Sequence, residues 1–207
     1  MSTICGGVSL GFTEETFPSG IHACYIFSDS RERESVIARF LARGLEDGES
    51  VSAFLDTFER GALLRALAGL GLPSDDPTYA GRLALTSALE TYCPDGRFDP
   101  DAMLERLRAL GQIDPECYAG MRATGEMTWA LNGLPGSERL MEYEARLNDV
   151  VQEQPCVNAL CQYDANRFSP RTLAHVLRVH PLMVVRGQLI RNPHYESRAG
   201  TARYPDE

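Results

Sequence analysis

Apolar and polar positions alternate along this chain in a repeated rhythm of strand and helix. Short β-rich apolar runs predict strands at residues 22–28, 50–55, 83–86, 118–124, 157–162, 182–185 and 188–190. The last of these is predicted to pair with the strand before it in a hairpin across Arg186-Gly187. Apolar residues three or four positions apart predict helices at residues 30–45, 59–70, 101–110, 137–152 and 170–179. This alternation is typical of one α/β domain with a mostly parallel sheet and right-handed crossovers.

The two ends of the chain do not follow this rhythm. Residues 1–17 are polar and Gly-rich, so we expect a loosely ordered lead-in or an edge strand, and residues 197–207 are predicted to be a polar tail. The domain therefore spans residues 18–196. Its first residues have no basic leader, and no apolar run reaches the ~18–20 residues of a membrane span, so we expect a cytoplasmic protein.

The basic residues change the functional picture, because all 20 are Arg and the chain contains no Lys. A P-loop needs a Lys at the β- and γ-phosphates, a Schiff-base enzyme needs an amine, and a β-lactamase site needs Ser-x-x-Lys. The composition excludes these classes. The net charge of −9 further argues against direct nucleic-acid binding and against binding to an anionic membrane.

Six cysteines are scattered through the chain, and in a reducing compartment we expect free thiols at Cys5, Cys24, Cys93, Cys117, Cys156 and Cys161. The chain contains no Cys-x-x-Cys motif. His22 and Cys24 lie two apart on a predicted strand and so share one face, and Cys161 lies on another interior strand. These three residues could hold copper or zinc or act as a thiol-redox sensor, or they could be a core histidine with packed thiols.

Ligands of such sheets bind beyond the carboxyl ends of the strands, where this sequence places a polar, acidic rim with two aromatic residues. We predict a small-ligand pocket there, in which a ligand stacks on an aromatic ring and is held by a few polar groups. Its predicted lining is His22, Cys24, Arg122, Glu126, Trp129, Tyr163 and Asp164. Residues 125–136, with three Gly and one Pro, are the predicted moving segment.

An enzymatic alternative has Glu126 as general base and His22 as its partner. Glu126 follows the fourth strand, where RecA-like NTPases keep a carboxylate, but residues 28–35 after the first strand are acidic and contain no Gly. ATP hydrolysis is therefore not expected, and we predict no catalytic residues. His175 and His180 flank a helix end, where histidines commonly interact with the helix dipole.

Several segments, in order, together resemble the MEDS domains (methanogen/methylotroph, DcmR-type sensory domains). The resemblance covers about residues 18–196 and is carried by residues 20–27 (GIHACYIF), 45–49 (LEDGE), 95–100 (DGRFDP), 122–130 (RATGEMTWA), 142–148 (EYEARLN), 159–164 (ALCQYD), 180–181 (HP) and 192–195 (NPHY). The order of these motifs along the chain, more than any single one, carries the resemblance.

The resemblance implies a KaiC/RecA-like fold that has lost its P-loop, a three-layer α/β/α sandwich around a mostly parallel sheet. It also implies a sensory, non-enzymatic domain for a small molecule, such as a hydrocarbon derivative, that signals to a histidine kinase or a transcription regulator. Because no helix-turn-helix or kinase segment is attached, we expect that partner to be regulated in trans. The cofactor is left undefined, with a metal at His22, Cys24 and Cys161 as an alternative reading, and a homodimer is left open.

Overall fold

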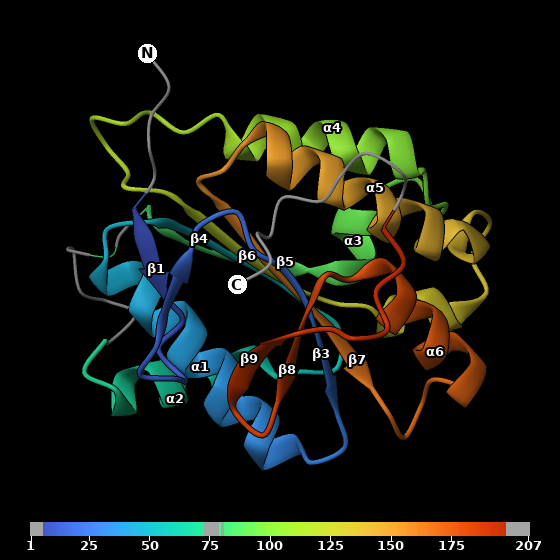
Figure 1. The fold of residues 1–207 in the computed structure, drawn as a ribbon, viewed down its shortest axis with the longest axis horizontal. Helices are drawn as coiled ribbons and strands as arrows, with labels where there is room; N and C mark the ends of the chain where they lie inside the picture. The colour runs from blue at the N-terminus through green and yellow to red at the C-terminus, as the bar shows by residue number, and fades with distance from the viewer. Residues whose placement is uncertain (1–5, 73–78, 80, 198–207) are drawn as a thin grey trace.

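A seven-stranded sheet in the order β5-β4-β6-β7-β3-β8-β9 divides the molecule into two helical layers (Figure 1). The computed structural model describes residues 6–72, 79 and 81–197. All neighbouring strands are parallel except β8 and β9, which form an antiparallel hairpin. The strands are β3 (His22–Phe27), β4 (Ser50–Leu55), β5 (Leu83–Ser87), β6 (Met121–Glu126), β7 (Val157–Asp164), β8 (Leu182–Val185) and β9 (Gln188–Arg191).

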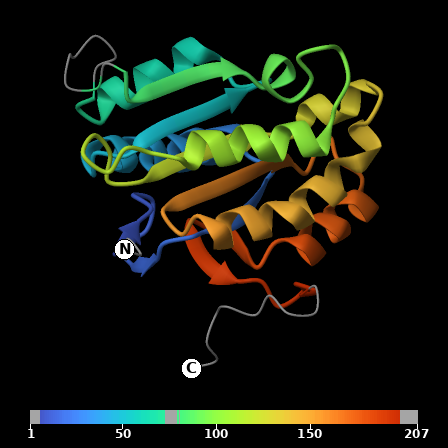
Figure 2. The same cartoon turned by 90° about the horizontal axis from the view of Figure 1, so that it is seen from above.

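Helices cover both faces of the sheet, so the predicted three-layer α/β/α sandwich is confirmed (Figure 2). One apolar core lies under α1 (Ser30–Glu46) and α2 (Arg60–Gly69). The other lies under α3 (Ala88–Tyr92), α4 (Pro100–Gly111), α5 (Leu140–Glu153) and α6 (Pro170–Val179). Two short 3-10 helices, η1 (Thr128–Asn132) and η2 (Ser137–Arg139), connect β6 to α5.

Strand periodicity sorts the polar residues of the sheet between these two layers. Successive side chains of a strand point to opposite faces. His22 of β3 and Cys161 of β7 therefore contact Glu144 of α5, whereas Arg122 of β6 contacts α1 on the opposite face. The parallel pairing sets Cys24 directly beside Cys161. One sheet thus carries two separate buried polar groups, one on each face.

Several boundaries differ from the prediction. In place of a loose lead-in, β1 (Gly7–Ser9) and β2 (Thr16–Pro18) form a hairpin whose Leu10 is fully buried. The predicted loop at residues 91–100 begins inside the short helix α3, because Ser87 caps that helix by accepting from the Glu90 N–H. The predicted strand 118–124 is displaced, since β6 begins at Met121. Of the predicted tail, residues 198–207 lie outside the described residues.

The cysteines do not all match the expectation of free thiols. Cys156, in the turn before β7, is disulfide-bonded, so the prediction is wrong for this residue. The prediction of free thiols was based on the expected compartment and on the size of the chain. Neither of these indicates which thiols lie within bonding distance of each other. Among the described residues four cysteines are free: Cys24, Cys93 and Cys161 are buried, and Cys117 is exposed. Cys5 lies outside the described residues.

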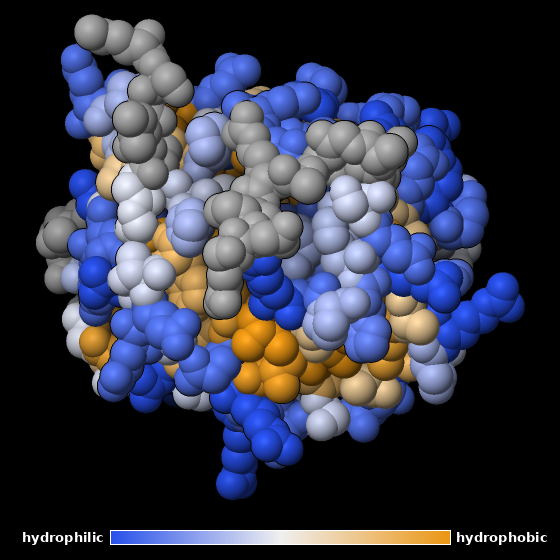
Figure 3. Space-filling model, in the orientation of Figure 1, coloured by the Kyte–Doolittle hydropathy of each residue, from blue (hydrophilic) through white to orange (hydrophobic). Residues whose placement is uncertain are grey.

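The surface of the molecule is mostly hydrophilic on the face shown in Figure 3, with a hydrophobic patch over the β8–β9 edge. Val185 and Ile190 of this hairpin are both exposed. No helix in the described part of the chain combines the length and the apolar character that crossing a bilayer requires.

Candidate functional site

The seven predicted pocket residues do not line one pocket. They lie on both faces and at both ends of the sheet, and Arg122 is the clearest departure. It is the second residue of β6, four positions and roughly 13 Å along the strand from Glu126. Its guanidinium forms a bidentate pair with Glu49, with Nε 2.7 Å and Nη2 2.9 Å from the two carboxylate oxygens, and it also donates to the Phe40 carbonyl. Arg122 is completely buried and joins β6 to the α1–β4 connection.

Glu126 does lie at the carboxyl end of the sheet, but its carboxylate is fully engaged. Oε2 accepts from the backbone N–H and the hydroxyl of Thr57, and Oε1 accepts from the Phe58 N–H and pairs with Arg33 at 2.8 Å. Arg33 lies over the rings of Phe27 and Phe58. A carboxylate held in this way has no free lone pair directed at a substrate.

The start of α1, where a phosphate loop would deliver its amides, is also occupied. The Asp29 carboxylate caps the helix by accepting from the N–H groups of Arg31 and Glu32, each at 2.8 Å. These hydrogen bonds hold the pKa of Asp29 below its ordinary value. Because a carboxylate takes the positive end of the helix, phosphate is repelled from it.

Trp129 and Asp164 take structural positions. Trp129 lies in η1 and is completely buried, with its ring stacked on Tyr92 at a centroid distance of 4.9 Å. Its chain segment turns back into the core, so the ring does not face a rim pocket. Asp164 ends β7 and accepts from the N–H of Asn166, which orders the following turn.

Two of the predicted residues, His22 and the metal candidate Cys161, meet two others in a buried polar cluster between the sheet and the helices α5 and α6. We call His22, Glu144, Cys161 and His180 the buried tetrad. Each offers one potential ligand atom, and these atoms all lie within 4.8 Å of one another. All four residues are buried. They come from β3, α5, β7 and the residue that ends α6.

The Glu144 carboxylate is the centre of the tetrad. Its Oε2 lies 3.1 Å from His22 Nε2, 3.3 Å from His180 Nε2 and 3.4 Å from Cys161 Sγ. Its other oxygen, Oε1, accepts a hydrogen bond from the Tyr163 hydroxyl. Tyr163 therefore orients the carboxylate, and its ring is completely buried against Phe168 and His180.

Burial and charge act strongly on the ionisable groups of the tetrad. Burial, and then the nearby His180, lower the pKa of His22, although Glu144 and Asn148 oppose this. Burial alone raises the pKa of Glu144, but the charge and hydrogen bonds of His180 and His22 in their protonated forms outweigh it and hold that pKa below its ordinary value. Burial and the Glu144 charge raise the pKa of the Cys161 thiol well above its usual range.

Cys24 is a neighbour of the tetrad and not a member of it. Its Sγ donates to the Leu182 carbonyl at 3.7 Å. Burial raises the pKa of the Cys24 thiol to about 12. The predicted metal set of His22, Cys24 and Cys161 is thus corrected at Cys24, while the other two lie together.

Glu144 and His180 are not among the predicted site residues, although the sequence carries a signal for Glu144. Glu144 falls on the apolar stripe of its helix, between Tyr143 and Leu147, and a charged residue on such a stripe indicates a buried partner. His180 was interpreted as a helix-dipole residue, but it is completely buried, with Nδ1 2.8 Å from the Val176 carbonyl.

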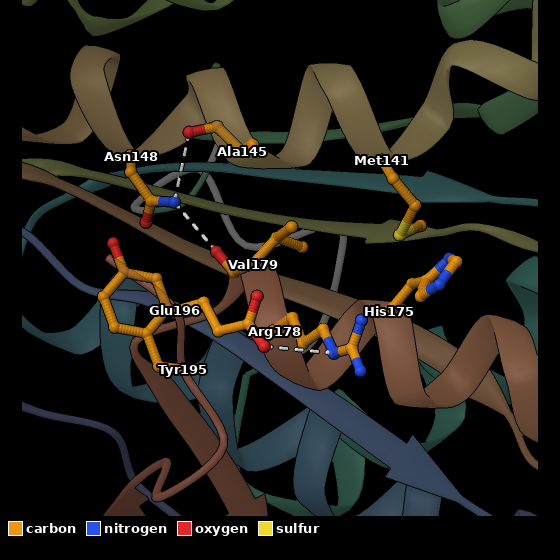
Figure 4. A pocket seen from close by; sticks show the side chains of 8 residues that line it. All are labelled: Met141, Ala145, Asn148, His175, Arg178, Val179, Tyr195 and Glu196. Carbon is orange, nitrogen blue, oxygen red and sulfur yellow. Dashed lines mark hydrogen bonds and ion pairs between the residues drawn. The ribbon is translucent and has the colours of Figure 1, made fainter. Parts of the chain in front are cut away.

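A groove of about 240 Å³ lies outside the tetrad, between α5 and α6 (Figure 4). We call it the α5–α6 groove, and its lining residues are Met141, Ala145, Asn148, His175, Arg178, Val179, Tyr195 and Glu196. Arg178 and Glu196 form an ion pair across it at 3.3 Å. Asn148 belongs to both features, because it lines the groove and its Oδ1 lies 2.9 Å from Nδ1 of His22.

Comparison with known proteins defines the family. The profile of the MEDS family, the methanogen/methylotroph DcmR sensory domain, matches residues 21–181, about three quarters of the chain. The chain belongs to the MEDS family. The matched MEDS region contains every strand of the seven-stranded sheet apart from β8 and β9. It also contains every residue of the buried tetrad. No curated protein sequence matches the chain.

Solved structures show the same fold for this MEDS domain. The flagellar accessory protein FlaH from Methanocaldococcus jannaschii is 12% identical, with a TM-score of 0.58 over 83% of this chain and 76% of its own. The KaiC-like protein PH0186 from Pyrococcus horikoshii is 15% identical, with a TM-score of 0.59 over 86% and 79%. The protein PH0321 from Pyrococcus horikoshii, solved with an unknown peptide, is 14% identical, with a TM-score of 0.59 over 80% and 76%. The predicted KaiC/RecA-like fold is confirmed.

Proposed function

We propose that this MEDS domain is a non-enzymatic sensor that binds a small organic ligand in the α5–α6 groove. The family match supports the sensory role. The observation that carries the choice of site is Asn148, which lines the groove and also holds the buried His22. A ligand in the groove would therefore act on a residue connected to the core.

The groove favours a ligand with a hydrocarbon part and an acidic group. Met141, Ala145 and Val179 supply apolar surface, and Arg178 and His175 supply groups that attract a carboxylate. The Glu196 carboxylate now pairs with Arg178, and a ligand carboxylate can take its place. This chemistry fits a short-chain carboxylic acid, one class of hydrocarbon derivative.

Asn148 supplies a route from the groove to the fold. Its Nδ2 donates to the carbonyl oxygens of Ala145 in α5 and Val179 in α6, at 3.2 and 2.8 Å. A ligand that changes the spacing of these helices would shift this amide and the His22 ring. Signalling then follows if the ligand binds the two arrangements with different affinities.

The state of Glu126 supports a non-enzymatic role. Its carboxylate is held by Thr57, Phe58 and Arg33, and its proposed partner His22 lies on the opposite face of the sheet, so the two do not form an acid–base pair. We propose that the output is regulation of a histidine kinase or a transcription regulator in trans, in the cytoplasm. The net charge of −9 supports an output without direct nucleic-acid or membrane binding. A homodimer stays a prediction.

The test is calorimetric titration with three probes that share one hydrocarbon chain, namely hexanoate, hexan-1-ol and hexylamine. We expect wild-type protein to bind hexanoate most tightly. Arg178→Gln should weaken hexanoate binding by about tenfold and leave hexan-1-ol binding unchanged, because only the charged contact is lost. Ala145→Trp should abolish binding of both by filling the groove.

Ala102→Trp is the matched control, since Ala102 is exposed on α4 and does not line the groove. It should bind all probes as the wild type does. The proposal fails if no probe binds the wild type, or if Ala145→Trp and Ala102→Trp bind hexanoate equally well. The proposed output is tested separately, by comparing the activity of a candidate histidine kinase with and without the sensor and hexanoate.

A further inference from the structure

The buried tetrad places two imidazoles, a carboxylate and a thiol around one point in the core. We propose that His22, Glu144, Cys161 and His180 bind a divalent transition-metal ion of the zinc class in a closed, four-coordinate centre. This inference goes beyond the proposed groove ligand, because the ion would be present whether or not the groove is filled.

The hydrogen-bond roles leave the centre of the tetrad without enough protons. Asn148 donates through Nδ2 to two carbonyls, so its Oδ1 must accept from Nδ1 of His22. Likewise Nδ1 of His180 donates to the Val176 carbonyl. In a neutral imidazole the other nitrogen is then an acceptor, so both Nε2 atoms direct lone pairs at the Glu144 carboxylate.

Three acceptors therefore face one another in the core, and only the Cys161 thiol carries a proton toward them. This shortage of protons leaves Nε2 of His180 without a hydrogen bond to any described group, although His180 is completely buried. The carboxylate oxygen Oε2 of Glu144 lies 3.3 Å from this nitrogen. An unpaired buried polar atom is rare in native proteins. A cation at the centre satisfies all of these lone pairs together.

The distances fit a tetrahedral ion. Zinc binds nitrogen and oxygen at about 2.0–2.2 Å and sulfur at about 2.3 Å, so the edges of a tetrahedron of such ligands are roughly 3.3–3.6 Å. Four edges of the tetrad are 3.1, 3.3, 3.4 and 3.6 Å, from Glu144 Oε2 to His22, His180 and Cys161, and from Cys161 to His22. The other two edges, from His180 to His22 and to Cys161, are at most 4.8 Å, so binding an ion requires these pairs to close by at most about 1.5 Å.

The groups behind the ligands have the arrangement that metal sites use. A metal-bound histidine usually donates its other N–H to a carbonyl or carboxylate, which fixes the ring and its tautomer. Here Asn148 and the Val176 carbonyl do this for His22 and His180, and Tyr163 holds Oε1 of Glu144 so that Oε2 faces the centre. The chemistry of the donors, with thiolate and imidazole among them, favours zinc or copper over magnesium or calcium.

The test begins with elemental analysis of protein purified without a histidine tag or chelator. We expect about one zinc or copper ion per chain in the wild type. Protein produced in medium supplemented with cobalt should show the intense absorption of a tetrahedral cobalt centre and a thiolate-to-cobalt charge-transfer band, since Cys161 would be a ligand. This measurement on the wild type decides the proposal even if every tetrad variant fails to fold.

The variants then assign the ligands. Cys161→Ser and His180→Gln should reduce the bound metal at least about tenfold, because each removes one ligand of four. Cys24→Ser is the matched control, as Cys24 is an equally buried thiol on the neighbouring strand whose sulfur contacts the Leu182 carbonyl. Circular dichroism checks that each protein is folded.

Two outcomes would overturn the proposal. One is folded wild-type protein with no stoichiometric metal and no cobalt spectrum, which would mean that a proton on an imidazole occupies the centre. The other is metal that persists in Cys161→Ser and His180→Gln. Binding of hexanoate to metal-free protein would bear on the groove alone, so failures of the two proposals remain distinguishable.

Discussion

Nε2 of His22 lies 3.1 Å from Oε2 of Glu144 where β3 meets α5, and both side chains are fully buried. This contact joins an interior strand of the sheet to the helix layer that covers it. It also links the tetrad to the α5–α6 groove, because Asn148 lies one helical turn after Glu144. The stability of the domain and its proposed sensing therefore depend on the same few groups.

Glu144→Gln should destabilise the domain by about 3–5 kcal/mol, the usual effect of removing one partner from a buried charged group. An amide has one acceptor oxygen in place of two, so it cannot accept from both the Tyr163 hydroxyl and the Cys161 thiol, and it carries no charge to pair with a cation. Urea unfolding measures the change. Glu142→Gln on the exposed side of the same helix is the control and should destabilise the domain far less, because its ion pairs with Arg139 and Arg146 are exposed to solvent. Equal midpoints for the two variants would show that the tetrad contributes no stability.

The buried pair of Arg122 and Glu49 predicts strong coupling between two substitutions. Arg122→Met leaves the Glu49 carboxylate buried without its partner and should cost about 3–5 kcal/mol. Adding Glu49→Leu removes that unpaired charge, so the double variant should be more stable than Arg122→Met alone. A double-mutant cycle by urea unfolding measures this coupling. Additive losses would mean that the two side chains act independently.

Thiol labelling should separate the four free cysteines by exposure. In native protein at pH 8, Cys117 should react readily with iodoacetamide, whereas Cys24, Cys93 and Cys161 should be protected. With a pKa of about 12, Cys24 is thiolate in only about one molecule in ten thousand at that pH. Mass spectrometry of peptides locates the label. Rapid native labelling of Cys161 would contradict the closed core described for the tetrad.

Two glycines test whether residues 125–136 form the moving segment that the sequence suggested. Gly136 has a positive φ of 89°, and an added Cβ would collide with the Phe98 carbonyl, so Gly136→Ala should destabilise by about 3 kcal/mol or more. Gly133 also has a positive φ but faces open space, so Gly133→Ala should cost only about 1 kcal/mol. Thermal unfolding compares them. Equal effects would show that the Gly136 turn is loosely held and free to move.

Periodicity predicted most of the fold, because long amphipathic stripes and β-rich runs are local signals. Strand β4, strand β8 and helix α6 begin and end where the sequence indicated. Fold and family followed from the order of these elements and their motifs, and the structure and the family profile confirm both. The short helix α3 was missed, since a five-residue helix has too few positions to show a period.

The site was predicted less well, because it depends on contacts between residues far apart in the chain. The sequence suggested His22 and Cys161, on two interior strands, as ligands of one site, and these two side chains do lie in contact. Arg122 was assigned to the same pocket as Glu126 although four strand positions separate them, and Trp129 was placed on the rim although its 3-10 helix returns to the core. The partners Glu144 and His180 lie on helices whose docking no local pattern describes.

Anomalous X-ray diffraction at the zinc and copper absorption edges tests the metal centre most directly, on crystals of protein never exposed to a chelator. We predict a single strong peak at the centre of the tetrad, about 2.0–2.3 Å from His22 Nε2, Glu144 Oε2, Cys161 Sγ and His180 Nε2. A crystal with no peak there, and with direct hydrogen bonds joining the four side chains, would contradict the account.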